Sequence, residues 1–326
     1  MKARVFAQRL FVFGAFMVVV ILSAGCPAES LPRPELLAVW GVSGSEPGEL
    51  RQPIGIAIRA DGTVFIADAG NDRVQSFESD GRFLRSIGGR GEGPGQFRRP
   101  MDLDIDSEGR LYVAEHVGDR IQVFTAEGAF LREIRGETTD AGSFDAAAGV
   151  LVSPAGELYV ADFYNDRVVV FREDGEFDRV IGTPGRVLPG RLHYPTDLDW
   201  VAERLVVADA YNNRIQLFTS QGEAVGRWGG LLGLGIPGSA PGSFRVATGV
   251  AVDVHDRIYV ADFENHRIQV FSDEGRLLSI FGSQGDAPGE FERPTDLDIG
   301  PDGRIFVVDF GNDRIQVFEP LPDTLR

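Results

Sequence analysis

Hydrophobic and polar positions alternate along this chain in short runs, and one such pattern recurs through almost its whole length. In the stretch Ile66–Phe77, apolar residues surround an acid, an asparagine and an arginine. Related stretches begin at Ile66, Val113, Val160, Val207, Val260 and Val307, at successive steps of 47, 47, 47, 53 and 47 residues. A fixed period of this length indicates a repeat architecture.

Each repeat holds four runs of strand-forming residues separated by turn residues, which we call strands a to d. In the second repeat the predicted strands are 101–105, 111–114, 119–124 and 130–134. A four-stranded antiparallel unit of this size is typical of a propeller blade. The absence of a 3.6-residue period excludes a helical solenoid.

The strand count also predicts how the ring closes. The last repeat ends after its strand c at Phe318, whereas an additional d-like run, Leu37–Gly41, precedes the first strand a. We therefore predict an all-β fold, a six-bladed β-propeller of four-stranded antiparallel blades closed by an N-terminal strand that completes the last blade. Ring closure pairs strand edges that a linear array would expose.

The N-terminus has the layout of an export signal. Basic residues precede the apolar run 10–22, which is too short to span a bilayer comfortably. The only cysteine, Cys26, directly follows Ala-Gly, which resembles the lipobox of bacterial lipoproteins and implies lipidation of its thiol. The predicted segments are a lipoprotein-type signal peptide (1–25), a tether (26–35), the propeller (36–319) and a tail (320–326).

The residue after the cysteine refines the predicted location. Pro27 stands there in place of an acid, which resembles an outer-membrane sorting pattern of Gram-negative lipoproteins. We expect a protein of the cell envelope, lipid-anchored through Cys26 at the periplasmic face of the outer membrane.

The repeated pattern itself resembles a known family. The pattern Gly-x-[Ile/Leu]-[Tyr/Phe]-Val-Ala-Asp-x-x-Asn-x-Arg-[Ile/Val]-Gln-x-Phe is similar to the NHL repeat, and the resemblance covers residues 36–319. NHL propellers include peptide-amidating lyases, RNA-binding modules, kinase sensor domains and bacterial lipoproteins, so the resemblance implies the fold and leaves function open. In the lyases, zinc histidines follow the strand-a proline. None of the corresponding residues here is histidine: Ile54, Met101, Thr196, Thr248 and Thr295.

Composition removes several classes of function. The chain has 49 acidic and 32 basic residues and a net charge of −17, which disfavours nucleic acid as a partner and attracts cations. Lys2 is the only lysine and lies in the predicted signal, so lysine Schiff-base chemistry is excluded. A single cysteine excludes an internal disulfide and a cysteine-rich zinc site.

Residues shared by all repeats are expected to be scaffold. The acid and the asparagine bound a tight b–c turn, where short acceptors bind turn amides. The arginine that follows is expected to form turn or inter-blade salt bridges. This set includes Arg73, Arg120, Arg167, Arg214, Arg267 and Arg314.

Function is expected where the repeats differ, and the clearest difference alternates around the ring. Strand a of the second, fourth and sixth repeats carries paired aspartates, where the other three repeats have glycine. The paired residues are Asp102, Asp104, Asp197, Asp199, Asp296 and Asp298. Such a ring binds a cation such as Ca²⁺, takes up protons, or pairs with arginines. We predict Asp102, Asp197 and Asp296 as ligand-binding residues, and Asp104, Asp199 and Asp298 as candidate Ca²⁺ ligands.

Aromatic residues gather at the face where the d–a and b–c loops emerge, which we call the loop face. They are His116, Phe163, Tyr164, Tyr211, Phe263 and Phe310. Aromatic side chains at polar loop tips either pack on neighbouring loops or contact a partner. The apolar insertion Leu231–Ile236, in the one long step, is predicted to contact a partner.

Together these features predict non-catalytic binding of a protein, a peptide or a cationic small ligand at the loop face. No catalytic residue is predicted, because the chain lacks channel histidines and nucleophile motifs. The alternative is a Ca²⁺-dependent propeller enzyme of the lyase or lactonase type that uses the aspartate ring.

Overall fold

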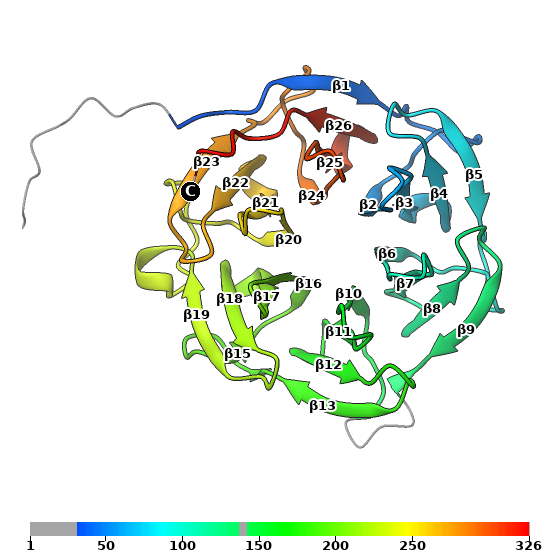
Figure 1. Cartoon of the computed structure of the whole chain (residues 1–326), viewed down its shortest axis with the longest axis horizontal. Helices are drawn as coiled ribbons and strands as arrows, with labels where there is room; N and C mark the ends of the chain where they lie inside the picture. The colour runs from blue at the N-terminus through cyan, green and yellow to red at the C-terminus, as the bar shows by residue number, and fades with distance from the viewer. Residues whose placement is uncertain (1–30, 137–141, 326) are drawn as a thin grey trace, which may run out of the picture. The chain divides into compact units, whose positions relative to one another are not determined.

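Six four-stranded antiparallel sheets surround a central axis in the computed structural model (Figure 1), which describes residues 31–136 and 142–325. The predicted signal peptide and Cys26 lie outside the described residues. From the innermost to the outermost strand, blade 1 consists of β2 (Pro53–Ile58), β3 (Val64–Asp68), β4 (Arg73–Phe77) and β5 (Phe83–Ile87). Blade 2 consists of β6 (Pro100–Ile105), β7 (Leu111–Glu115), β8 (Arg120–Phe124) and β9 (Phe130–Ile134). Blade 3 consists of β10 (Ala147–Val152), β11 (Leu158–Asp162), β12 (Arg167–Phe171) and β13 (Phe177–Ile181). Blade 4 consists of β16 (Pro195–Val201), β17 (Arg204–Asp209), β18 (Arg214–Thr219) and β19 (Ala224–Trp228). Blade 5 consists of β20 (Ala247–Val252), β21 (Ile258–Asp262), β22 (Arg267–Phe271) and β23 (Leu277–Phe281). Blade 6 consists of β24 (Pro294–Ile299), β25 (Ile305–Asp309), β26 (Arg314–Phe318) and the N-terminal strand β1 (Leu36–Trp40).

The predicted closure is confirmed. β1 pairs antiparallel with β26, with Ala38 opposite Val317 and Trp40 opposite Ile315. Figure 1 shows this first strand, in blue, beside the last, in red, so that the two ends of the propeller share one sheet. The six-bladed, all-β fold predicted from the repeats is therefore the fold observed.

The core lies between adjacent blades. Each sheet packs both faces against neighbours, so its middle strands are buried throughout, as in β3 and β7. One cluster, for example, joins Phe65 of blade 1 to Leu111 and Phe124 of blade 2 around the fully buried Phe97. Short apolar strands therefore suffice for a large core, because every blade is covered on both sides.

The repeated acid, asparagine and arginine are scaffold, as predicted. In blade 1, Asp68 Oδ1 accepts the Arg51 N–H at 2.7 Å, and Oδ2 accepts Arg73 Nε at 2.7 Å and Asn71 Nδ2 at 2.9 Å. Blade 2 has a glutamate at the acid position, and its Gly118 makes room for the longer side chain. A Cβ at 118 would lie 2.7 Å from Glu115 Oε2.

A second contact joins each blade to the next. The residue before strand c has a positive φ in every blade, as at Asp72 (52°). Its side chain accepts the N–H of the residue that directly precedes strand a of the next blade. The six acceptors are Asp72, Asp119, Asp166, Asn213, His266 and Asp313. These bonds fix the main chain where it enters the centre of the ring.

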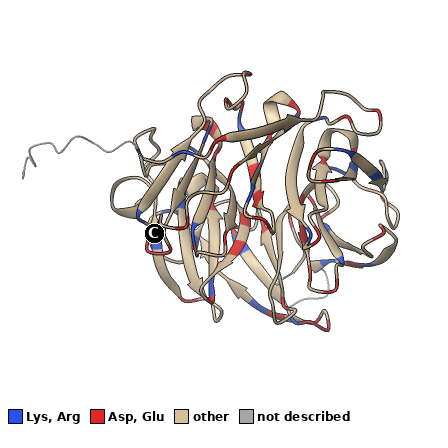
Figure 2. Cartoon of the chain, turned by 45° about the horizontal axis from the view of Figure 1, so that its top comes forward, with Lys and Arg blue, Asp and Glu red and all other residues tan. Residues whose placement is uncertain are grey.

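Smaller elements complete the described chain. Turns b–c include the 3₁₀ helices η1 (Ala69–Asn71), η3 (Ala210–Asn212), η5 (Phe263–Asn265) and η6 (Phe310–Asn312); η4 (Leu231–Gly233) lies in the long insertion, and β14 (Thr183–Pro184) pairs parallel with β15 (Arg191–Leu192). Within residues 31–136 and 142–325, no helix is long and apolar enough to cross a membrane. Basic and acidic positions are intermixed around the ring (Figure 2).

Candidate functional site

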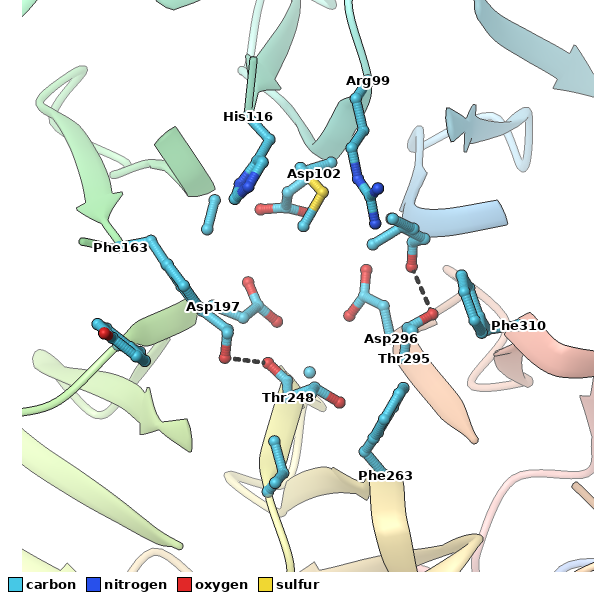
Figure 3. A pocket seen from close by; sticks show the side chains of 18 of the residues that line it. Arg99, Asp102, His116, Phe163, Asp197, Thr248, Phe263, Thr295, Asp296 and Phe310 are labelled. Atoms are coloured by element: carbon cyan, nitrogen blue, oxygen red, sulfur yellow. Dashed lines mark hydrogen bonds between the residues drawn. The ribbon is translucent and has the colours of Figure 1, made fainter. Parts of the chain in front are cut away.

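The innermost strands and the b–c turns enclose a cavity of about 390 Å³ at the loop face, which we call the funnel. All nine residues predicted to bind a ligand line it: Asp102, His116, Phe163, Tyr164, Asp197, Tyr211, Phe263, Asp296 and Phe310. Figure 3 shows the three aspartates converging from different blades, with aromatic side chains around them. Residues far apart in the sequence thus form one site because they occupy equivalent positions in the repeats.

The floor of the funnel is made by Asp102 on β6, Asp197 on β16 and Asp296 on β24. Their carboxylates are fixed by the next blade around the ring. Asp102 Oδ2 accepts the Val150 N–H at 2.8 Å, and the equivalent bonds are Asp197 to Val250 (2.7 Å) and Asp296 to Ile56 (2.9 Å). The floor is therefore an ordered set of acceptors.

A second layer of carboxylates repeats this arrangement below the floor. Asp104, Asp199 and Asp298 accept the N–H groups of Val152, Val252 and Ile58. Among the described residues, none of the six aspartates forms an ion pair with an arginine, so the alternative of an arginine-paired ring is wrong. The reason is that the innermost strands of blades 1, 3 and 5 present edge N–H groups to the preceding blade, and buried N–H groups need acceptors.

The glycines that alternate with these aspartates have an equally direct cause. A Cβ on Gly55 would lie 2.4 Å from the Met101 carbonyl oxygen, and one on Gly149 would lie 2.6 Å from that of Thr196. At the seams between blades 1 and 2, 3 and 4, and 5 and 6, the backbones approach too closely for a side chain. At the other three seams, an aspartate bridges the blades, which explains the three-fold alternation.

The aspartate ring holds protons near neutral pH. Burial raises the pKa of Asp104, Asp197 and Asp298 to about 7. Burial also raises the pKa of Asp102 and Asp296 well above its usual value, and the neighbouring Asp197 carboxylate adds to the effect. This favours the proton-uptake alternative.

The structure describes no group of three or more His, Cys, Asp or Glu side chains arranged to hold a metal ion within residues 31–136 and 142–325. The second-layer aspartates line a cavity of about 80 Å³ beneath the funnel and already accept backbone N–H groups. Ca²⁺ binding by Asp104, Asp199 and Asp298 stays a prediction.

The raised pKa values predict that stability falls as pH rises. In the unfolded chain these carboxyls titrate near 3.8, and in the folded ring near 7. Between these values the folded protein holds more protons than the unfolded one, so its stability decreases as the pH rises from about 4 through 7. We expect the melting temperature at pH 5 to exceed that at pH 8 by roughly 5 °C or more.

Thermal melts across this pH range test the prediction. Asp61→Asn is the matched control, because Arg59 lowers the pKa of that outer carboxyl, and it should leave the difference intact. A melting temperature that rises from pH 5 to pH 8 would contradict the assignment of the protons to the ring.

Aromatic rings build the walls of the funnel. Phe163 stacks on Tyr194 with centroids 4.7 Å apart, and His116 lies edge-on to Phe163 at 6.0 Å. Across the funnel, Phe263 and Phe310 are 6.4 Å apart. Packing between adjacent b–c turns therefore occurs, and the rings still face the cavity. Tyr164 remains 50% exposed, so part of the aromatic wall is open to solvent.

Sequence reasoning missed several funnel residues, among them Arg99 and Tyr194. Both directly precede a strand-a proline and have positive φ values of 57° and 55°, which turn the chain into the ring. The residue at this position differs from blade to blade, whereas much of the repeat around it is similar in all blades. That variation was the signal in the sequence that could have identified Arg99 and Tyr194. The six residues at this position are Gln52, Arg99, Ala146, Tyr194, Val246 and Arg293.

The polar groups on the blade-2 wall lack partners. His116 Nδ1 is buried and has no hydrogen-bond partner among the described residues, and burial, with the nearby Arg99 charge, lowers the pKa of the imidazole. Arg99 projects into the funnel near Asp102 (Figure 3). By contrast, His193 contacts Asp166 and His266 accepts the Arg293 N–H.

The long insertion packs beside blade 4. A Cβ on Gly235 would lie 1.8 Å from the Asn212 carbonyl oxygen, so the insertion touches the b–c turn that carries Tyr211. Leu231 and Leu232 are 67% and 82% exposed. A partner contact through this loop stays a prediction.

Comparisons with known proteins agree with this architecture. A family model described as a 6-bladed β-propeller matches residues 50–149, and the NHL repeat model matches 244–271 and 291–318. The RING finger protein nhl-1 of Caenorhabditis elegans is 44% identical over 52 residues, which are 16% of this chain and only 5% of that protein.

Solved structures show the same fold at low identity. A protein of unknown function from Bacteroides thetaiotaomicron has a TM-score of 0.69 at 16% identity, covering 88% of this chain and 76% of that one. An inactive virginiamycin B lyase variant from Staphylococcus aureus with quinupristin has a TM-score of 0.60 at 18% identity, covering 89% of each chain. A streptogramin B lyase has a TM-score of 0.59 at 15% identity over 86% of this chain and 96% of that one. The chain is thus a six-bladed β-propeller in which residues 244–271 and 291–318 match the NHL repeat.

Proposed function

We propose that this protein is a non-catalytic binding module whose funnel recognises a ligand carrying a cationic group. The observation that supports this most is the convergence of Asp102, Asp197 and Asp296 at the floor of an aromatic-walled cavity. A cation placed there gains carboxylate contacts and the faces of aromatic rings. The volume falls within the range of small-molecule sites, roughly 300–1,000 Å³.

Both parts of the funnel are held in place before any ligand arrives. The floor carboxylates accept backbone N–H groups from neighbouring blades, and the wall rings stack on one another. Preorganisation of this kind reduces the ordering cost of binding. The ligand's charged group could be a free amine or the side chain of a peptide or protein loop, since the funnel opens at the loop face.

Binding of a cation should displace protons from the floor, so affinity should depend on pH. Phenethylamine, which carries an ammonium group and an aromatic ring, is a simple probe for calorimetric titration. We expect its affinity to fall roughly tenfold or more between pH 8 and pH 5.5, because protonated carboxyls attract the ammonium less. At pH 8, Asp197→Asn should weaken binding by a similar factor.

Asp61→Asn, on the outer part of blade 1, is the matched control and should bind like the wild type. Thermal melts establish that each variant is folded, and the pH series needs no variant at all. Binding that is independent of pH and of Asp197 would contradict the proposed site.

The enzymatic alternative has weaker support. A Ca²⁺-dependent lyase or lactonase needs converging metal ligands, whereas residues 31–136 and 142–325 contain no group of three or more His, Cys, Asp or Glu side chains arranged to hold a metal ion. The similarity to the streptogramin-class lyases concerns the fold alone, at 15–18% identity. A binding role therefore explains more of the geometry.

We further propose that the propeller is anchored in the cell envelope through lipid on Cys26. The support is the sequence layout of residues 1–26, which lie outside the described part. We expect Cys26→Ser to move the protein from the membrane fraction to the soluble fraction of cells. Tyr211→Ala, a loop-face change, should leave fractionation unchanged. Equal membrane retention of Cys26→Ser and wild type would refute the lipid anchor.

A further inference from the structure

We propose that the funnel ligand is a zwitterion, whose anionic group is bound by Arg99 and His116 while its cationic group meets the aspartate floor. This inference rests on the proposed cation site and adds the second half of the ligand. The chemical class is a compact α-amino-acid-like molecule, free or at a peptide end, with an apolar side chain.

Arg99 is held in place by its main chain and leaves its charge unpaired. Its φ is 57°, its N–H donates to Asp72 Oδ1 at 2.8 Å, and its carbonyl oxygen accepts the His116 N–H at 3.2 Å. Across the described residues, its guanidinium has no ion-pair or hydrogen-bond partner, although it lines the funnel. Its side chain is exposed, and a guanidinium with five N–H donors at the edge of a cavity is suited to bidentate binding of a carboxylate.

Arg293, the equivalent arginine before blade 6, shows that this position in the repeat does not by itself leave a guanidinium unpaired. Arg293 lies over the Phe263 ring at 5.7 Å and is 3.5 Å from Glu264. In the b–c turn of blade 1, which is equivalent to the turn that contacts Arg293, the positions of Phe263 and Glu264 are taken by Ala69 and Gly70, so this turn offers Arg99 no acid. The blade-2 wall therefore carries a positive charge that the protein does not neutralise locally.

His116 supplies a second donor beside Arg99. Its Nδ1 is buried without a partner among the described residues, and the imidazole ring itself lines the funnel. Its lowered pKa keeps the ring neutral, with one N–H available to an anionic oxygen. The backbone hydrogen bond between Arg99 and His116 holds the two groups on one wall.

The spacing of opposite charges points to a small zwitterion. Arg99 and Asp102 come from the same end of β6, and Figure 3 shows the two side chains near each other. An ammonium and a carboxylate on one carbon atom match such neighbours. The remaining aromatic wall, with Phe163 and Phe263 on different sides, would then contact an apolar side chain.

Three probes that share one phenyl ring separate the charges. Phenethylamine carries only the cation, 3-phenylpropionate only the anion, and phenylalanine both. Titration of each into the purified protein at pH 8 should show phenylalanine binding about tenfold or more tighter than phenethylamine, as expected for charge-assisted hydrogen bonds. The anion alone should bind weakest, because the floor repels it.

Arg99→Gln removes the charge at a position where the repeat tolerates glutamine, since Gln52 occupies the same register with φ 45°. We expect this variant to lose the preference and to bind phenylalanine no tighter than phenethylamine. Arg293→Gln is the matched control and should preserve the preference for phenylalanine.

The outcomes separate the two proposals. If phenethylamine binds and phenylalanine binds no tighter, or if Arg99→Gln leaves the preference intact, the zwitterion inference is overturned and the cation site stands. If neither compound binds at millimolar concentration, the cation site is refuted, and the inference that rests on it also fails.

Discussion

Replacing Arg214 with methionine is expected to lower the free energy of unfolding by about 3–5 kcal/mol, because a buried carboxylate loses its charged partner. Arg214 and Asp209 are both fully buried and are joined by an Nε–Oδ2 bond of 2.7 Å. The guanidinium also donates to the carbonyl oxygens of Val187 and Arg191 in the preceding d–a loop. Methionine has similar bulk and none of these donors.

The loss should grow as pH rises. Burial raises the pKa of Asp209, and the charge of Arg214 opposes this rise. Without Arg214 the carboxyl keeps a proton more readily, so the variant is damaged least in acid. Urea unfolding at pH 5 and pH 8 measures both effects. Arg276→Met, at an exposed position, is the control and should lower the free energy of unfolding by less than about 0.5 kcal/mol. An equal loss of stability in both variants would contradict a stabilising role of the buried Arg214–Asp209 ion pair.

Gly55→Ala is expected to destabilise the propeller by about 3 kcal/mol or to prevent ring closure. Its Cβ would lie 2.4 Å from the Met101 carbonyl oxygen and 2.7 Å from Asp102 Cα. Both are backbone atoms of a strand that is held on its other side, so neither can move away cheaply. Overpacking of this kind typically costs about 1–3 kcal/mol and occasionally more.

The same substitution at Gly93 provides the comparison. There the nearest atom to a new Cβ is the flexible Gln96 Oε1 at 3.0 Å. Gly93→Ala should therefore unfold at nearly the wild-type urea concentration, whereas Gly55→Ala should unfold at a much lower one. If Gly55→Ala matched the wild type, the close approach of blades 1 and 2 would be wrong.

The alternation of aspartate and glycine makes the ring a set of three two-blade units. Within a unit, two backbones touch through glycine; between units, carboxylates bridge the strands. Bridging seams place acids in the centre, and those acids form the floor of the funnel. One structural solution for joining blades thus also creates the electrostatics of the site.

The repeats carried enough information to predict the fold and the membership of the site. Six copies of one pattern defined the strands, and the unpaired run at Leu37–Gly41 predicted closure because every other strand d had a partner. Equivalent positions in a propeller converge, so unusual residues at those positions, such as Asp102 and Phe163, could be assigned to one face without knowledge of distances.

What the sequence could not supply was the state of individual backbone groups. The sequence left arginine pairing open as one of three roles for the aspartates, because only coordinates reveal that Val150 and its counterparts present N–H groups to the aspartates of the preceding blade. Arg99 and Tyr194 escaped notice for a related reason. Their positive φ values direct side chains into the funnel from positions outside the strand pattern.

The most direct test of the cation-binding funnel is a crystal structure of the protein with phenethylamine at pH 8. The account predicts the ammonium nitrogen about 2.7–3.2 Å from a carboxylate oxygen of Asp102, Asp197 or Asp296, with the phenyl ring against the aromatic wall. Phenethylamine bound only elsewhere, such as at the exposed Leu231–Ile236 loop, with the funnel filled by water, would contradict it.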